Sequence, residues 1–271
     1  MRARRESAAT TSRPSEQPTV TPGFGPCGTR RRPAFPLRTA PGPVGSRRRL
    51  GRVTIMRLAL FDLDGTLVDR TAAFADAIAG LCRDHRYGPD VEAWLLTRLA
   101  DHADRSDFAR LRAEFGLGES AEHLWRVYVD RMAAAVTCRP AVLHSLGLLK
   151  ECGWSIGVAT NGSSDIQRAK VRATGLADLV DGIAASGDID VRKPDPRLFE
   201  LAAARCGTQL TAGDWMTGDN PETDIAGGHR TGLRTIWVEG RLAWPEGLTV
   251  PHHRVTNVLD AIDHLLTHSP G

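Results

Sequence analysis

The pattern of hydrophobic and polar residues divides this chain near residue 56 and predicts alternating strands and helices beyond that point. Short apolar runs that end in Gly, Asp, Thr or Ser predict strands, and these runs lie at 57–62, 155–160, 181–186, 214–219 and 234–240. Apolar residues at helical spacing follow between the later runs, at 140–152, 163–174, 196–206 and 221–231. Because strands alternate with helices, we expect an α/β protein with a parallel sheet covered on both faces, that is, three layers.

The interval 71–138 departs from this alternation. It contains amphipathic helical segments near 71–84, 91–103, 106–115 and 119–135, and the pattern predicts no strand among them. Since the interval lies between the first and second strands, we expect an all-helical module inserted into the core. The predicted core is therefore built from 56–70 and 139–271, with the helical module at 71–138.

Residues 1–55 show no hydrophobic period. They are rich in Arg, Pro, Gly, Ser and Thr and cannot bury enough apolar surface to offset chain entropy, so we expect a disordered basic extension. The segment also lacks the apolar stretch of a secretory signal. One hypothesis is that natural translation begins at Met56. A transit peptide and a basic arm for nucleic acid are the alternatives.

The net charge of +3 hides an asymmetry between the two parts of the chain. Residues 1–55 hold 12 arginines and two glutamates, which leaves 23 basic and 30 acidic residues in 56–271. The body is therefore acidic, and nucleic acid is not an expected partner. The five cysteines are scattered without a C-x-x-C pair and indicate neither a disulfide scaffold nor a zinc site. No apolar run approaches the roughly 18 residues of a membrane span, so we expect a cytoplasmic protein without a membrane partner.

Carboxylates stand at the predicted strand ends, the edge at which α/β proteins gather functional groups. The stretch "DLDGT" places Asp62 and Asp64 at the end of the first strand, where buried carboxylates are costly unless paired or bound to a metal. The stretch "GDNPETD" supplies a second acidic site with Asp219 and Asp224. Because Mg²⁺ prefers oxygen ligands, these four residues predict a magnesium site.

Two further clusters could receive an anion. Lys193 in "RKPDPRLF" offers a fixed positive charge before a predicted helix. Thr160, Asn161 and Gly162 open another helix and offer a hydroxyl and backbone N–H groups. With the carboxylates, the chain then has a nucleophile, a proton donor, a cation and an anion site, which are the parts that phosphoryl transfer needs. The acidic residues Asp188 and Asp190 between these clusters are expected to be solvated loop residues.

The four clusters, in this order and at these intervals, resemble the four motifs of the haloacid dehalogenase superfamily over roughly 56–240. The run "GSSDIQRAKVRATGLADLVDGIAASGDIDVRKPDPRLFELA" also resembles the small-molecule phosphatases of that superfamily that carry an inserted helical cap. The resemblance implies a Rossmann-like core, with the cap at 71–138.

The resemblance also implies catalytic roles. Asp62 would be the nucleophile that forms an aspartyl-phosphate, and Asp64 would be the general acid and base. As a general acid near neutral pH, Asp64 would need a pKa raised above its usual range. Lys193 would neutralise the charge that develops between the nucleophile and the phosphoryl group.

Binding roles follow in the same way. Thr160, the backbone N–H of Asn161, Gly162 and Lys193 would hold the phosphoryl oxygens. Asp62, the backbone carbonyl of Asp64, and Asp219 would hold Mg²⁺. Asp224 would act on the metal directly or through water, although capping of the helix at 221–231 is an alternative role for it.

The function implied by the resemblance is a Mg²⁺-dependent phosphatase that hydrolyses a small soluble phosphate monoester, such as a nucleotide or a sugar phosphate. A phosphosugar mutase of the same superfamily keeps both aspartates and stays an alternative, as does a non-catalytic binding module that retains the fold. Asp64 argues against a dehalogenase, and the absence of lysine from 70–138 argues against a phosphonate hydrolase. The sequence specifies neither the physiological substrate nor the oligomeric state.

Overall fold

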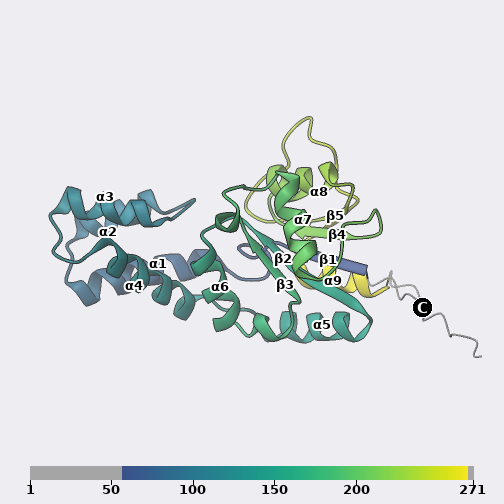
Figure 1. The fold of residues 1–271 in the computed structure, drawn as a ribbon, viewed down its shortest axis with the longest axis horizontal. Coiled ribbons are helices and arrows are strands. Elements are labelled where there is room, and N and C mark those ends of the chain that lie inside the picture. The colour runs from purple at the N-terminus through teal and green to yellow at the C-terminus, as the bar shows by residue number, and fades with distance from the viewer. Residues whose placement is uncertain (1–56, 268–271) are drawn as a thin grey trace, which may run out of the picture. The chain divides into compact units, whose positions relative to one another are not determined.

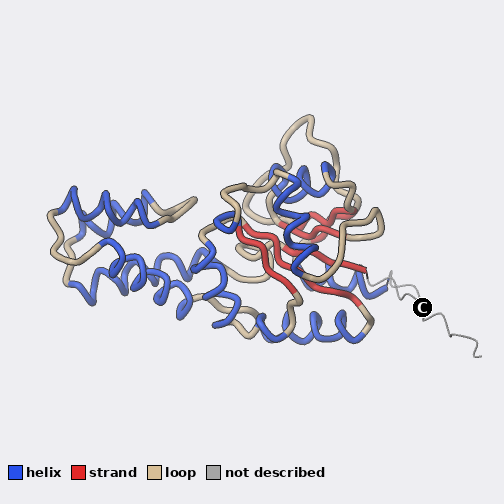
Figure 2. Tube along the Cα trace, in the orientation of Figure 1, coloured by secondary structure: helices blue, strands red, loops and turns tan. Residues whose placement is uncertain are grey.

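A parallel six-stranded sheet forms the core of the computed structural model, which describes residues 57–267 (Figures 1 and 2). The strand order is β3-β2-β1-β4-β5-β6. The strands are β1 (Arg57–Phe61), β2 (Trp154–Thr160), β3 (Gly182–Ala185), β4 (Trp215–Gly218), β5 (Arg234–Val238) and β6 (His253–Val255). The predicted α/β class is therefore confirmed.

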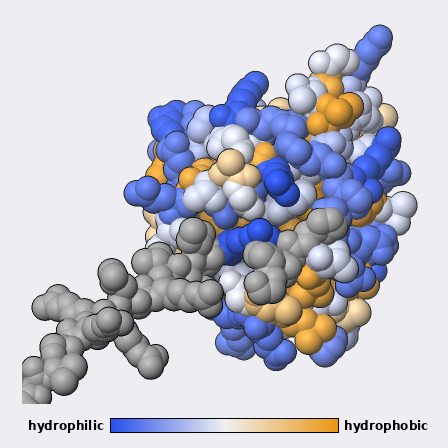
Figure 3. Space-filling view, turned by 90° about the vertical axis from the view of Figure 1, so that its right-hand side faces the viewer, coloured by the Kyte–Doolittle hydropathy of each residue, from blue (hydrophilic) through white to orange (hydrophobic). Residues whose placement is uncertain are grey.

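Helices cover both faces of the sheet, because successive residues of each strand point to opposite sides. Ala59 and Phe61 belong to the hydrophobic core beneath α5 (Pro140–Glu151) and α9 (Val258–Thr267). Leu58 and Leu60 belong to the core on the other face. That face carries α7 (Pro196–Arg205) and α8 (Ala226–Arg230), as Figure 1 shows. Both faces are thus shielded, and Figure 3 shows an outer face on which hydrophilic residues predominate between smaller apolar areas.

The central position of β1 determines where the candidate site lies. β1 pairs with β2 on one side and with β4 on the other, and all three strands run parallel. Phe61, the last residue of β1, stands opposite Val158 of β2 and Thr217 of β4. The segments that follow these three strands therefore leave the sheet at the same edge.

Four helices between β1 and α5 form a separate hydrophobic core. They are α1 (Arg70–His85), α2 (Pro89–Arg98), α3 (Arg105–Phe115) and α4 (Ala121–Ala135). Phe108, Trp125 and Tyr128 pack at the centre of this module, with ring centroids 5.4–5.9 Å apart. The inserted all-helical cap that the sequence predicts is present. By their contacts, the described residues 57–267 belong to one compact unit, and the domain boundaries drawn from the sequence stay predictions.

The cap contacts the core through α6 (Ser164–Ala173), the helix that follows β2. Ile166 of α6 packs into the hydrophobic core of the cap, beside α4. Asp165 accepts a hydrogen bond from the indole of Trp125 at 2.6 Å and pairs with Arg105 at 3.1 Å. The first turn of α6 is therefore held by cap residues on one side.

Several element boundaries differ from the prediction. The helix expected at 91–103 ends at Arg98, where the segment that leads to α3 begins. The helix expected at 221–231 starts as a wide π-helical turn, η3 (Pro221–Ile225), before it becomes α8. Strand β6 and helix α9 were not predicted. β6 has only three residues and carries the polar sequence "HRV", so it shows neither a long apolar run nor an alternation.

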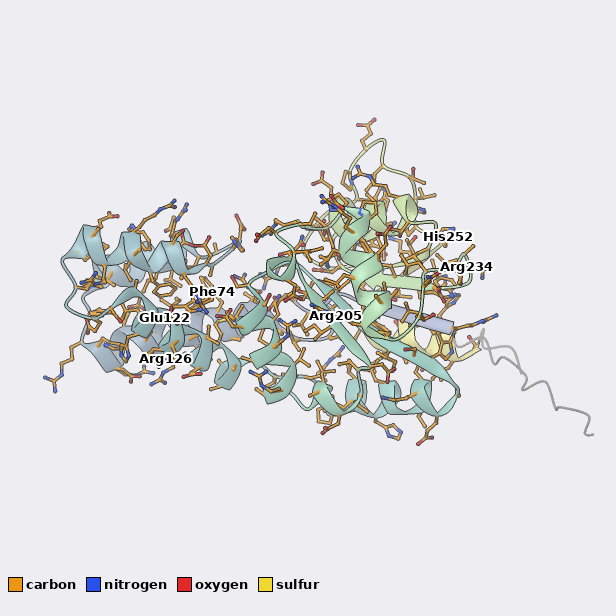
Figure 4. All side chains as sticks on the ribbon, viewed as in Figure 1. Phe74, Glu122, Arg126, Arg205, Arg234 and His252 are labelled. Carbon is orange, nitrogen blue, oxygen red and sulfur yellow. The ribbon has the colours of Figure 1, made fainter. Side chains whose placement is uncertain are left out.

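Asp188 is wrongly predicted as a solvated loop residue. Its carboxylate, 7% exposed, pairs with Arg168 of α6 at 2.8 Å and with Arg205 of α7, which Figure 4 labels beside the strands. It also accepts a hydrogen bond from Ser164. Burial alone would raise the pKa of Asp188, but these donors hold it well below its usual range. Asp188 thus ties the loop after β3 to two helices, whereas Asp190 is exposed as expected.

The predicted basic extension at 1–55 and the residue Met56 lie outside the described residues. Among residues 57–267, no single helix is long and apolar enough to cross a membrane, and α4 and α5 pass that test only as a pair bent by 84°. The cysteines of the described part, Cys82, Cys138, Cys152 and Cys206, are all free.

Candidate active site

Asp62 follows β1 directly and lies at the edge where the strands end. Its backbone N–H donates to the Thr217 carbonyl at 2.9 Å, which extends the pairing of β1 with β4 by one residue. The chain then turns at Gly65, whose φ of +87° lies in the left-handed region that favours glycine. A Cβ at residue 65 would also collide with the Asp219 carboxylate. Glycine is thus required twice here, by the turn and by the close approach of Asp219.

Lys193 enters from the loop before α7 and ends between two carboxylates. Its Nζ lies 2.5 Å from Asp62 Oδ1 and 2.7 Å from Asp224 Oδ1, and it donates to the Ala159 carbonyl at 2.7 Å. Only 2% of the side chain is exposed. Burial lowers the pKa of Lys193, but the Asp224 and Asp62 carboxylates outweigh that effect and raise it above its usual range. Lys193 is therefore a fixed positive charge.

The side chain of Asn161 holds the backbone of Lys193 in place. Asn161 Oδ1 accepts from the Lys193 N–H at 2.8 Å, and Asn161 Nδ2 donates to the Lys193 carbonyl at 3.2 Å. This reciprocal pair joins the end of β2 to the loop that carries the lysine. The sequence prediction concerned only the backbone N–H of Asn161, and this role of its side chain was not foreseen.

Three carboxylates meet beside Lys193. Oxygens of Asp62, Asp219 and Asp224 all lie within 4.8 Å of one another. At that separation, two like charges repel by about 3 kcal/mol at an effective dielectric constant of about 20. Burial raises the pKa of Asp219 to about 6, and Asp224 adds to the effect. Burial likewise raises the pKa of Asp62, against the opposing charge of Lys193. The cluster therefore carries more negative charge than its lysine balances.

This cluster fits a divalent cation such as Mg²⁺. Its donors are carboxylate oxygens, and Mg²⁺ is commonly held by one or two protein carboxylates. Both oxygens of Asp224 already have partners, since Oδ1 pairs with Lys193 and Oδ2 accepts the Asn220 N–H at 3.0 Å. Asp62 and Asp219 are therefore the more available ligands, and Asp224 is better suited to act through water.

The predicted anion site at the end of β2 is only partly open. Thr160 is buried, and its Oγ1 accepts a hydrogen bond from Gln167 Nε2 at 2.7 Å. The Gly162 N–H donates to Ser186 Oγ at 2.9 Å, so this group is already used in the described structure. The binding roles of Thr160, Asn161 and Gly162 stay predictions, and that of Gly162 would require its N–H to leave Ser186.

Asp64 lies apart from the three-carboxylate cluster and is bound by helix α6. Both of its carboxylate oxygens lie 2.8 Å from Lys170 Nζ, and Oδ2 also accepts from Gln167 Nε2 at 3.0 Å. Burial alone would raise the pKa of Asp64, but Lys170 and Gln167 outweigh it, and the pKa lies below its usual value. The expectation of a raised pKa for Asp64 is therefore wrong, because Lys170 and Gln167 favour the ionised carboxylate.

Two cavities reach this region. One of about 660 Å³ opens between the turn after β1 and the loop after β5, and its lining includes Asp64, Arg70, Asp219 and Arg241. A smaller cavity of about 30 Å³ lies between cap and core and is lined in part by Asp64, Tyr128 and Lys170. The larger volume falls in the range of small-molecule sites. The smaller one is about the volume of a single water molecule.

Lys170 and Gln167 are the site residues that sequence reasoning missed. Their spacing of three positions on a predicted helix was a signal that both face the same side. The chain has only three lysines, and one that lies three residues after a glutamine on a predicted helix could have been noticed on that ground. Nothing in the sequence, however, indicated which carboxylate they would meet.

Comparison with known proteins shows what the chain resembles. A family model described as haloacid dehalogenase-like hydrolase matches residues 59–238. The chain is 32% identical over 122 residues to the pyrimidine 5'-nucleotidase YjjG of Escherichia coli, which covers 45% of this chain and 54% of the relative. It is 36% identical over 103 residues to a phosphoserine phosphatase of Thermus thermophilus, covering 38% and 41%. These alignments span about half the length of the two relatives.

Among solved structures, a 2-haloacid dehalogenase from Pseudomonas syringae superposes with a TM-score of 0.61 at 26% identity. The superposition covers 79% of this chain and 99% of the other. Proteins similar to this chain thus include phosphatases and dehalogenases, which share one fold but differ in the bond they break.

Proposed function

Because this chain belongs to the haloacid dehalogenase-like hydrolases, we propose that it is a Mg²⁺-dependent phosphatase that acts on a small phosphate monoester through a covalent intermediate on Asp62. The proposal is supported above all by one observation. The Asp62 carboxylate lies 2.5 Å from a buried lysine, in a cluster with two further carboxylates, at the edge where the strands end. A nucleophile beside a fixed cation is suited to a dianionic phosphate.

The reaction has two half-reactions. In the first, a bond forms between an Asp62 oxygen and phosphorus, the bond to the leaving oxygen breaks, and Asp64 donates a proton to that oxygen. In the second, water attacks phosphorus, the bond to Asp62 breaks, and the water proton returns to Asp64. The first half-reaction leaves Asp64 as the carboxylate that the second needs as a base, and the second restores the carboxylic acid that the first needs.

The remaining residues bind and orient. Lys193 offsets negative charge between Asp62 and the phosphoryl group, and Asn161 holds the backbone of that lysine. Thr160 offers a hydroxyl to a phosphoryl oxygen, and its Oγ1 accepts a hydrogen bond from Gln167 that orients it. Asp62 and Asp219 would hold Mg²⁺ with the backbone carbonyl of Asp64, and Asp224 would support it. The ion supplies positive charge that offsets the phosphoryl oxygens and favours ionised Asp62.

Asp64 is the residue that favours a phosphatase over a dehalogenase. A halide leaves as a stable anion and needs no proton, whereas an alcohol does. A carboxylate two residues after the nucleophile has a task only in the second case. A phosphosugar mutase also needs this carboxylate and stays an alternative, in which the phosphoryl group would return to a sugar faster than to water.

The proposed partner is a small phosphorylated metabolite. The cavity of about 660 Å³ beside Asp64 and Asp219 has the volume of a small-molecule site, and the names of the relatives include a nucleotidase and a phosphoserine phosphatase. A cytoplasmic location, without a nucleic-acid or membrane partner, is part of the same proposal.

A substrate screen tests this function. The full chain is incubated with p-nitrophenyl phosphate and about a hundred phosphorylated metabolites, with Mg²⁺ or with EDTA, and phosphate release is measured. We expect release that requires Mg²⁺ and is strongest for a few related monoesters. Chloride release from 2-chloropropionate without phosphate release from any ester would contradict the proposal and favour a dehalogenase.

A further inference from the structure

Helix α6 sends two buried side chains to Asp64. Lys170 and Gln167 lie three positions apart, so they share one face of the helix. The Lys170 side chain is 2% exposed, and its Nζ lies 2.8 Å from each oxygen of Asp64. Burying an ammonium group is costly unless its charge is paired in good geometry, and a contact to both oxygens of one carboxylate provides that geometry.

Gln167 joins the same carboxylate to the end of β2. Its Nε2 donates to Asp64 Oδ2 at 3.0 Å, to Thr160 Oγ1 at 2.7 Å and to the Asn161 carbonyl at 3.2 Å. Two N–H bonds thus serve three acceptors. Its Oε1 is buried and has no hydrogen-bond partner among the described residues. Gln167 alone therefore holds Asp64 weakly, and the main restraint on that carboxylate is Lys170.

The ion pair also fixes the direction of the Asp64 side chain. Asp64 lies within a tight turn, in which the Gly65 N–H donates to the Val68 carbonyl at 2.9 Å and the Val68 N–H to the Leu63 carbonyl at 3.0 Å. The backbone of this turn is thus defined, but an aspartate side chain can still rotate about its own bonds. Lys170 removes this freedom, because a contact with both oxygens defines the position and the plane of the carboxylate.

From this geometry we propose that Lys170 is a positioning residue for Asp64, holding the carboxylate where it exchanges a proton with the leaving oxygen. The inference rests on the phosphatase function proposed above, in which Asp64 is the acid. Lys170 itself does not touch the phosphoryl group in this role. It acts through Asp64, whereas Lys193 acts on the nucleophile.

Two kinds of ester separate this role from a purely structural one. The p-nitrophenolate group leaves without a proton, whereas an alkyl alcohol needs one, so only alkyl esters depend on a well-placed acid. The measured quantity is kcat/KM, because it reports the transfer to Asp62 and not the later hydrolysis common to both esters. The substrates are p-nitrophenyl phosphate and the alkyl phosphate that the wild-type chain hydrolyses best.

The test variant is Lys170→Met in the full chain. We expect kcat/KM to fall on the order of 100-fold for the alkyl ester, and less than about 10-fold for p-nitrophenyl phosphate, since positioned general acids contribute about 10²–10⁴-fold. Lys170→Gln keeps a hydrogen-bond donor at the site and takes the place of Lys170→Met if that variant does not fold, as judged by circular dichroism. In either variant, the test is the ratio of the kcat/KM for the alkyl ester to the kcat/KM for p-nitrophenyl phosphate.

The matched control is Lys150→Met. Lys150 pairs with Asp181 at 2.8 Å, but its side chain is 40% exposed and lies outside the site. This variant should leave the ratio of the two kcat/KM values unchanged. Equal losses on both esters in the Lys170 variant, or no loss on either, would overturn the inference while leaving the phosphatase proposal intact. A wild-type chain that hydrolyses neither ester would instead contradict the phosphatase proposal, and the inference with it.

Discussion

Two buried lysines, each paired with an aspartate of "DLDGT", belong to two regions of the site that differ in charge balance. One is the sheet edge with Asp62, Asp219, Asp224 and Lys193, and the other is the α6 face, where Lys170 and Gln167 meet Asp64. At the sheet edge, Lys193 faces three carboxylates, and the pKa values of Asp62 and Asp219 are raised. On the α6 face, Lys170 meets Asp64 alone, and the pKa of that carboxyl is lowered. Burial pushes both pKa values upward. At Asp62 it prevails over Lys193, with Asp224 and Asp219 adding to it, whereas at Asp64 the contacts from Lys170 and Gln167 outweigh it.

The difference indicates what each region still lacks. The sheet edge has excess negative charge, so it is suited to a divalent cation and to a nucleophile that becomes ionised when the cation binds. The α6 face is already balanced and needs no ion. Its ionised carboxylate is ready to accept a proton from water, and it must first gain a proton to serve as an acid.

Replacing the nucleophile should have the largest effect. Asp62→Asn keeps the size of the side chain but removes the carboxylate, and we expect phosphate release to fall by at least about 10⁴-fold. The variant should remain folded, because it reduces the charge repulsion at the sheet edge. Turnover of the best substrate, measured beside a thermal melt, checks both points. A folded variant with substantial activity would show that Asp62 is not the nucleophile.

Replacing the lysine of the same region should have the next largest effect. Lys193→Met removes the charge beside Asp62, and we expect kcat to fall by about 10²–10³-fold, the usual cost of losing one group that stabilises transition-state charge. Lys150→Met serves again as the control, since it removes a lysine far from the reaction. Near-wild-type turnover in folded Lys193→Met would contradict the role of this residue.

Mg²⁺ should stabilise the sheet edge and not the α6 face. At a Mg²⁺ concentration about 100 times its Kd, the stabilisation is about 3 kcal/mol, or a rise in Tm of about 5–10 °C. We expect this rise to be lost in Asp219→Asn and kept in Asp64→Asn, whose backbone carbonyl is unchanged. Calorimetry of the wild-type chain and both variants, with and without Mg²⁺, measures this rise in Tm. A rise of equal size in both variants would mean that the two regions do not differ in this way.

The same rise in Tm should depend on pH. Burial raises the pKa of Asp219 to about 6, so protons compete with Mg²⁺ for this carboxylate at a higher pH than for an exposed aspartate. Burial also raises the pKa of Asp62, the other proposed ligand, to about 8. The Mg²⁺-induced rise should therefore be full only above about pH 9 and shrink as the pH falls through about 8 and then about 6. A rise that persists unchanged to about pH 5 would show that Asp219 does not bind the ion.

The two regions also differ in how well the sequence predicted them. The sheet edge could be predicted, because "DLDGT" and "GDNPETD" both follow apolar runs, and parallel strands bring such ends together. The α/β class and the helical cap followed from the change of hydrophobic period. Strand β6 was not predicted, because its three residues are too few to show a hydrophobic run or an alternation.

The α6 face could not be predicted, because its main contact joins residues 106 positions apart. The helical period placed Lys170 and Gln167 on one face, but not opposite Asp64. The sequence therefore offered no reason to expect that the pKa of Asp64 is lowered, since this shift results from its contact with Lys170. The contact between Gly162 and Ser186 likewise joins two loops whose approach no local pattern records.

The covalent step is tested most directly by trapping the intermediate. In Asp64→Asn, transfer to Asp62 from p-nitrophenyl phosphate needs no proton, but the water step lacks its base, so the phosphorylated chain should accumulate. The variant is mixed with p-nitrophenyl phosphate and Mg²⁺, quenched in acid and digested for mass spectrometry. We expect a phosphoryl group on Asp62 that hydroxylamine removes. Phosphate release with no label on Asp62, or label on another residue, would contradict the covalent step.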